Sequence, residues 1–422
     1  MRSKILGLVM VGMFILLSKV YAFYLPDYSF LGIPPGSLSS GFSERYLGPN
    51  IEKLIPNVSL EGPYKDVPVI TAQQQPGGPQ VQEFFNLNID AATAVTYLES
   101  LKPFLSPEEQ KALDELIAFL KAHPQAKVGL SLVRKGDNEI GLNIMTGDEG
   151  NSFFLDVDLI GDKALLDGLM QKWEEVKKNI DNNGQLTPQG KQLLDDLFKE
   201  IKTNLQGKKI TLQNAEVNKT VKKTLDPVKD KEAINKIVNA TIEYLKKNGL
   251  GNQAENMRKE IESALKTNGV KVSSIESYTN GKQTRSDLMI TGANLDYRVL
   301  AGYNEKGEVN FGEMSKQDNQ NHQTYVLSVE KSQVFPGETK EEAAKRYFLK
   351  NFGITDPANH AQLKNVWTQI VNNWGNWTIS SENTFTSTLE GRNGKVNLTF
   401  TYGGQKIQLS FDYTISGKKP GN

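Results

Sequence analysis

The apolar residues between Ala91 and Ile160 first recur with the spacing of a helix and then alternate with the spacing of a strand. Ser106 opens the second helical stretch, and Glu109 completes a capping box three residues later. Three alternating segments follow, over 127–133, 139–145 and 152–160, with turn residues between them. Because the apolar period sets which face of an element is buried, this stretch predicts two amphipathic helices followed by an antiparallel meander.

The same pattern returns in two later stretches, and a helix pair followed by one strand lies between the first stretch and the second. It predicts an α+β fold made of repeated helix-pair plus antiparallel β-meander units. True duplication and generic helix-to-strand junctions are both consistent with the weak identity between the stretches. The expected segments are a first unit at 83–162, a helical hairpin half-unit at 163–231, a second unit with an extra hairpin at 232–338, a third unit at 339–416 and a flexible tail at 417–422.

Residues 1–22 have the pattern of a secretory signal peptide. Arg2 and Lys4 precede an apolar run over 5–17, and Val20-Tyr21-Ala22 supplies small residues for cleavage. The run is shorter than the roughly 20 apolar residues needed to span a bilayer, which favours cleavage over an uncleaved anchor. We therefore expect a mature chain beginning near Phe23, exported to the periplasm or secreted, with no transmembrane segment after cleavage.

The amino-acid composition limits the kinds of site and partner that we expect for this protein. The chain contains no cysteine, so an exported form has no disulfide and no thiolate metal site, and packing must supply its stability. Removal of residues 1–22 leaves 46 basic against 49 acidic residues, a net charge of −3. This balance lacks the basic surface that nucleic-acid binding requires, and we expect no nucleic-acid partner.

A proline-rich and aromatic-rich extended arm, with a hinge at Gln73–Pro79, is expected over 23–82. This segment contains nine of the seventeen prolines, which forbid continuous helix and central strand. Its aromatic and aliphatic residues carry more apolar surface than a solvated linker does. We expect the arm to dock, either on the units of its own chain or on a partner in the envelope.

A loop between two predicted helices imitates a calcium-binding loop. Asp181 and Asn183 supply oxygen atoms at alternate positions, and Gly184 takes the sixth position. The twelfth position is Gly190, where such a loop requires a bidentate glutamate. The alternative, which the pattern favours, is an Asn-Gly turn in a helical hairpin with Thr187 as the cap of the second helix.

Asp156 and Asp158 are a second candidate for cation binding or for acid–base chemistry, because side chains two apart in a strand share a face. The alternative is that they form the solvated face of an amphipathic strand. No histidine or basic residue is expected beside them to tune their chemistry.

The remaining candidates are aromatic and histidine residues. Trp367 and Trp374 are seven apart and fit one buried helix face, whereas Trp377 begins the next strand and is the candidate ligand contact. His123, His322 and His360 have no metal-ligand spacing and no nucleophile motif to serve. We expect no catalytic residue and no cofactor.

These features favour an exported, non-enzymatic envelope protein that binds a protein partner or an extended ligand through its surfaces. One alternative is a periplasmic carrier or chaperone of an apolar, lipid-like ligand, which a connected apolar cavity would support. The other is a carboxylate-dependent hydrolase of envelope polymers, which two carboxyl groups about 5 to 10 Å apart across a cleft would support.

Overall fold

A computed structural model describes residues 87–126, 128–148, 151–181, 185–335, 337–388 and 391–416. These residues divide into two compact units, one containing 87–222 and 277–283 and the other containing 223–276 and 284–416. The expected signal peptide, the arm at 23–82 and the tail at 417–422 lie outside the described residues.

The described residues contain eight α-helices and thirteen strands, and each strand is hydrogen-bonded to the next one along the chain. Neighbouring strands run antiparallel. The expected α+β class with antiparallel meanders is therefore confirmed at this level. Among these described helices, none combines the length and the apolar character that crossing a membrane demands.

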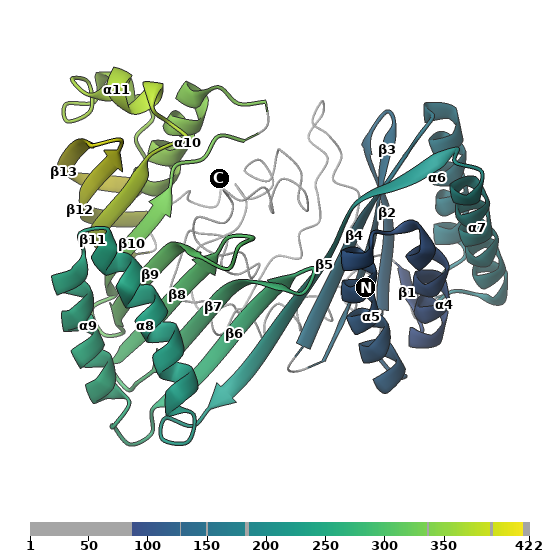
Figure 1. Ribbon diagram of the computed structural model, residues 1–422, viewed down its shortest axis with the longest axis horizontal. Coiled ribbons are helices and arrows are strands. Elements are labelled where there is room, and N and C mark those ends of the chain that lie inside the picture. The colour runs from purple at the N-terminus through teal and green to yellow at the C-terminus, as the bar shows by residue number, and fades with distance from the viewer. Residues whose placement is uncertain are drawn as a thin grey trace. The chain divides into compact units, whose positions relative to one another are not determined.

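The first unit begins with a short strand and alternates helix pairs with strands (Figure 1). Ser106 Oγ accepts the backbone N–H of Glu109 while the Glu109 carboxylate accepts that of Ser106, so the expected capping box is confirmed. Its elements are β1 Leu87–Ile89, α4 Ala91–Leu101, η3 Lys102–Phe104, α5 Pro107–Ala122, β2 Val128–Gly136, β3 Glu139–Gly147, β4 Asn151–Gly161, α6 Lys163–Lys178, α7 Pro188–Gln206 and β5 Ile210–Leu225.

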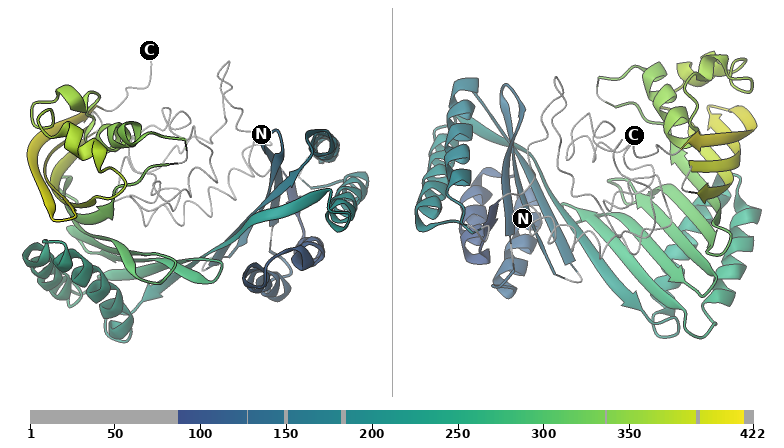
Figure 2. Two further views of the ribbon diagram at one scale, coloured as in Figure 1. Left: turned by 45° about the horizontal axis from the view of Figure 1, so that its top comes forward. Right: turned by 180° about the vertical axis from the view of Figure 1, so that it is seen from behind.

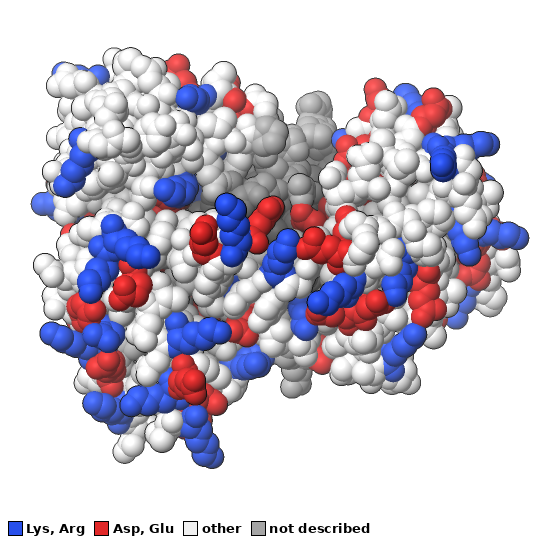
Figure 3. Space-filling view, in the orientation of Figure 1, with Lys and Arg blue, Asp and Glu red and all other residues white. Residues whose placement is uncertain are grey.

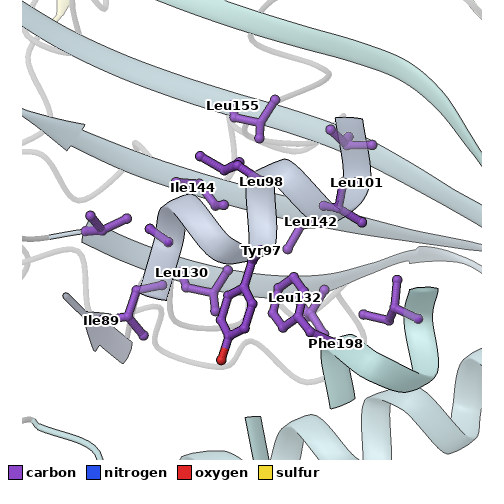
Figure 4. Packing of buried hydrophobic residues seen from close by; sticks show 14 of the residues in the cluster. Ile89, Tyr97, Leu98, Leu101, Leu130, Leu132, Leu142, Ile144, Leu155 and Phe198 are labelled. Atoms are coloured by element: carbon purple, nitrogen blue, oxygen red, sulfur yellow. The ribbon is translucent and has the colours of Figure 1, made fainter. Parts of the chain in front are cut away.

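One core joins all four helices of the first unit to a single face of its strands. Leu130, Leu142 and Leu155 on three neighbouring strands are buried in it (Figure 4). The rings of Tyr97 on α4 and Phe198 on α7 stack with centroids 3.8 Å apart. Burial of each large aliphatic side chain contributes about 1.5–3 kcal/mol, which makes this shared face the main source of stability in the unit.

The second unit contains the later helices and strands, and the boundary between the units passes through β5, β6 and β7. Its elements are α8 Lys231–Lys247, α9 Gly251–Ala264, β6 Lys271–Thr279, β7 Lys282–Thr291, β8 Leu295–Tyr303, β9 Val309–Asp318, β10 Gln323–Lys331, α10 Lys340–Phe352, η4 Pro357–Asn359, α11 Trp367–Asn372, β11 Thr378–Thr388, β12 Gly391–Tyr402 and β13 Gln405–Ser416.

The two helix pairs of this unit pack against opposite faces of its strands. In β10, Leu327 and Val329 belong to the core under α8 and α9, whereas Val326 belongs to the core under α10 and α11. The left view of Figure 2 shows α8 and α9 outside the curve of the strands and α10 inside it. Successive helix pairs in this unit are thus not placed alike on the sheet.

The third helix pair is also shorter than the apolar spacing indicates. The helix expected to carry both Trp367 and Trp374 ends at Asn372, so Trp374 lies beyond it. Gly375 follows with a φ of +94°, a conformation that glycine adopts without strain, and turns the chain toward β11. Both indoles are nevertheless buried, as expected.

Replacement of Phe400 by alanine tests this last core. Phe400 is fully buried between Phe348, Trp374 and Trp377, with ring centroids 5.9–6.4 Å away. F400A should lower the free energy of unfolding by about 3–5 kcal/mol, because both apolar contact and volume are lost. The exposed neighbour Thr401→Ala is the matched control, with an expected loss below about 1 kcal/mol. Chemical denaturation measures both, and a loss in F400A as small as that of the control would show that this face is open.

Candidate functional site

The two aspartates of β4 lie on the face opposite the helices. Leu155, Val157 and Leu159 alternate with them and enter the core of the first unit. The aspartates are also buried, with Asp156 2% and Asp158 4% exposed. The alternative of a solvated strand face therefore does not describe them.

A lysine neutralises this acidic pair, and the expectation that no basic residue lies beside it was wrong. Lys135 Nζ lies 3.1 and 3.0 Å from the two carboxylate oxygens of Asp156 and 2.5 Å from Asp158 Oδ1. The Lys135 side chain is 20% exposed. Burial disfavours its ammonium form, but the charges of Asp156 and Asp158 outweigh this and raise the pKa of Lys135 above its usual value.

Local backbone geometry brings this lysine across an intervening strand. Lys135 is the extra residue of a bulge in β2, because Arg134 pairs with Ile140 and Gly136 pairs with Glu139. Its side chain then passes over Gly141 on β3, which pairs with Asp158 on β4. A Cβ atom at Gly141 would lie 2.6 Å from Lys135 Cε, so the missing side chain provides the path.

A second bulge adds an amide to the same cluster. The register between β4 and β5 shifts between Asp156 and Asp158, and Asn214 on β5 has a φ of +51°. Asn214 Nδ2 donates to Asp158 Oδ2 at 2.8 Å. Glu139 is close enough to the cluster that burial, together with the charge of Asp158, raises its carboxyl pKa. The charged and polar groups of the cluster thus form hydrogen bonds and ion pairs with one another.

The described residues on either side of the candidate calcium loop form the start of a capped helix, which is the interpretation that the sequence favoured. Thr187 Oγ1 accepts the backbone N–H of Gly190 at 3.1 Å and caps α7, as the alternative interpretation expects. The carboxylate of Asp181 accepts the backbone N–H of Gln185 at 3.0 Å. Asn183 lies outside the described residues. Among the residues that are described, no group of three or more His, Asp or Glu side chains is placed to hold a metal ion.

Trp377, the candidate ligand contact, is fully buried. Its indole Nε1–H donates to the carbonyl of Ile370 at 2.8 Å, and its backbone N–H donates to Ser332 Oγ at 3.0 Å. The ring therefore presents no open face for stacking on a ligand. Among the histidines, His123 Nδ1 lies 2.9 Å from the carbonyl oxygen of Phe119, whereas the ring of His360 packs against Phe411.

The second unit contains a buried charge cluster that sequence patterns did not indicate. Asp287 on β7 is fully buried and accepts both Nε–H and Nη2–H of Arg298 on β8, at 3.0 and 2.9 Å. Arg285 Nη2 donates to the same carboxylate at 2.6 Å. Burial disfavours the charged form, but the two guanidinium groups outweigh it and lower the pKa of Asp287. The only local signal was the spacing of two between Arg285 and Asp287, which places them on one strand face.

Glu330 on β10 is half-buried, and its carboxyl group differs in its surroundings from that of Asp287. Burial raises its pKa to about 7, against the opposing charges of Lys350 and Arg346 and a hydrogen bond from Tyr347. Tyr347 lies on α10, and burial followed by the charge of Glu330 raises its own pKa well above the usual value. A carboxyl group with a pKa of about 7 has the acidity that a general acid needs near neutral pH.

No family model, curated protein or solved structure matches this chain. Its function is therefore inferred from the residues and geometry described above.

Replacement of Lys135 by methionine tests the charge balance at Asp156 and Asp158. K135M should lower the free energy of unfolding by about 3 kcal/mol at pH 7, because it leaves two neighbouring buried carboxylates without their ammonium. Because the loss arises from uncompensated negative charge, K135M should regain stability relative to the unmodified protein as the pH falls from 7 toward 4. Denaturation at several pH values measures this.

Two variants control that experiment. Lys121→Met removes an exposed pair with Glu99 and should cost less than about 1 kcal/mol. K135M/D158N removes one of the two carboxylate charges and should recover part of the loss at pH 7. A K135M protein whose deficit is the same at pH 4 and pH 7 would contradict an electrostatic role for Lys135.

Calcium should leave the thermal unfolding midpoint unchanged. Gly190 supplies no carboxylate, and a Cβ at this position would lie 2.6 Å from the carbonyl oxygen of Asn179, so the helix start leaves no room for a larger residue. Thermal scans in chelator and in millimolar calcium make the comparison. A midpoint several degrees higher in calcium would show that other oxygens complete a site.

Proposed function

We propose that this protein is an exported, non-enzymatic component of a bacterial envelope that binds a protein partner or an extended ligand through its surfaces. The signal-peptide pattern at 1–22, the absence of cysteine and the near-neutral composition support this location and argue against a nucleic-acid partner. Over α8 and α9, basic and acidic side chains are interspersed rather than gathered by sign (Figure 3). The repetition of helix-pair and meander units remains part of the same proposal.

The proposal that the protein is not an enzyme depends on one observation. Its buried charged groups neutralise one another. Lys135 engages both Asp156 and Asp158, and Asp287 engages both Arg285 and Arg298. Acid–base and nucleophilic catalysis need a proton or a lone pair that the substrate can reach. In both clusters the charged groups instead contact one another, which is the arrangement of a structural ion-pair network.

A carboxylate-dependent hydrolase is the second candidate, and one observation favours it. The pKa of about 7 at Glu330 is suitable for a general acid. Its surroundings oppose this assignment. The Glu330 carboxyl interacts with the charges of Lys350 and Arg346 and accepts a hydrogen bond from Tyr347, all of which belong to the protein itself. A glycoside hydrolase needs a second carboxylate across the substrate, at about 5 to 10 Å.

Recovery of the tagged protein from the cells that produce it tests the proposed function. Proteins and lipids that co-purify are identified together, and amino-terminal sequencing establishes whether the chain begins near Phe23. We expect a specific protein or polymer partner. A specific lipid would favour the carrier alternative, and release of soluble fragments from envelope polymers, lost in Glu330→Gln, would favour the hydrolase.

Deletion of residues 23–72 locates the binding element within the same experiment. If the arm docks on its own chain, the deletion should lower the unfolding midpoint, because apolar contacts are lost. If the arm binds the partner, the deletion should keep the midpoint and abolish co-purification. A truncated protein that retains both its stability and its partners would show that the arm is a passive tether.

A further inference from the structure

Within the described part of the chain, the last strand of the sheet has a neighbour on one side only. β13 pairs with β12 at twelve consecutive positions, from Gly391 opposite Ser416 to Tyr402 opposite Gln405, without a register shift. Among the described strands no other pairs with β13 (Figure 1). The segment 405–416 contains no proline and no bulge, which are two of the devices that keep sheet edges from pairing.

The sequence of β13 is complementary to itself in one antiparallel register. Two copies that pair about a two-fold axis at Leu409 place Lys406 of each copy opposite Asp412 of the other. These are the two charged residues of the strand, so this register forms two opposite-charge pairs. It also places Ile407 opposite Phe411.

The burial of β13 is consistent with this register. Its side chains alternate between exposed and buried from Lys406 to Tyr413. When the two-fold axis passes through Leu409, even-numbered residues pair with even-numbered ones and odd-numbered residues with odd-numbered ones. Exposed side chains therefore meet exposed ones, and buried side chains meet buried ones. Asp412 also lies opposite Lys395 of β12 within its own chain, and Lys406 of a second copy would flank it on the other side.

We propose that the edge of β13 left without a neighbour among the described strands pairs with β13 of a second copy of this chain, centred on Leu409, to form a two-fold symmetric dimer. Charge complementarity selects this occupant over the arm at 23–82. The nine prolines of the arm cannot donate to a strand ladder, and they interrupt it at short intervals.

Sedimentation velocity of the purified protein over a range of concentrations tests this proposal. The unmodified protein should dimerise reversibly. Lys406→Glu places acidic residues opposite Asp412, and Asp412→Lys places two lysines opposite each other, so each variant alone should raise the dimer dissociation constant about tenfold or more. An equimolar mixture of the two variants should restore dimerisation, because the mixed dimer again contains opposite-charge pairing that each single variant lacks.

Lys364→Glu, an exposed charge reversal outside β13, is the matched control and should leave the dissociation constant unchanged. Thermal unfolding of each variant shows whether its protomer is intact, including any cost in D412K of a second ammonium group opposite Lys395. A monomer at every concentration, or a mixture that dimerises no better than its components, would overturn the proposal. Dimerisation that appears only after deletion of residues 23–72 would also overturn it, since the arm would then hold the edge.

Discussion

Alternation along the strands determines where the helices of this protein pack. In the first unit the buried apolar residues of β2, β3 and β4 point to one face, so four helices share one core. In the second unit β10 has apolar residues at both parities. Leu327 and Val329 serve α8 and α9, whereas Val326 serves α10 and α11. A single strand with apolar residues on both faces therefore lets consecutive helix pairs lie on opposite sides of one sheet.

The same alternation forces polar residues onto the opposite face, where burial makes isolated charge costly. Each unit offsets this cost with a cluster of paired charges, and the two clusters have opposite ratios of basic to acidic groups. In the first, one ammonium serves two carboxylates, and in the second, two guanidinium groups serve one carboxylate. Arginine suits the second arrangement, because its planar group binds the carboxylate of Asp287 through two parallel hydrogen bonds.

The sequence predicted the features that depend on near neighbours. The capping box at Ser106 and the α7 cap at Thr187 each involve groups three residues apart, and the burial of Phe400 follows from alternation. It did not predict Lys135 beside Asp156, because their contact depends on a bulge and on pairing between residues 21 apart in the chain. The same limit applies to Arg298 and Asp287. The spacing of Trp367 and Trp374 predicted a last helix that is too long, because residue spacing does not reveal where the backbone hydrogen bonds of a helix end.

Gly141 connects the charge cluster to the choice of strand register. With β2 bulged at Lys135, the lysine passes over a residue without a side chain and reaches two carboxylates. Hydrophobic alternation alone does not penalise a slip of two residues, which returns apolar side chains to the core. After such a slip along β3, Glu139 or Asn143 would lie beneath the lysine in place of the glycine, and two buried acids would be left uncompensated. The lysine, the glycine and the acidic pair together therefore penalise a register that hydrophobic alternation alone would tolerate.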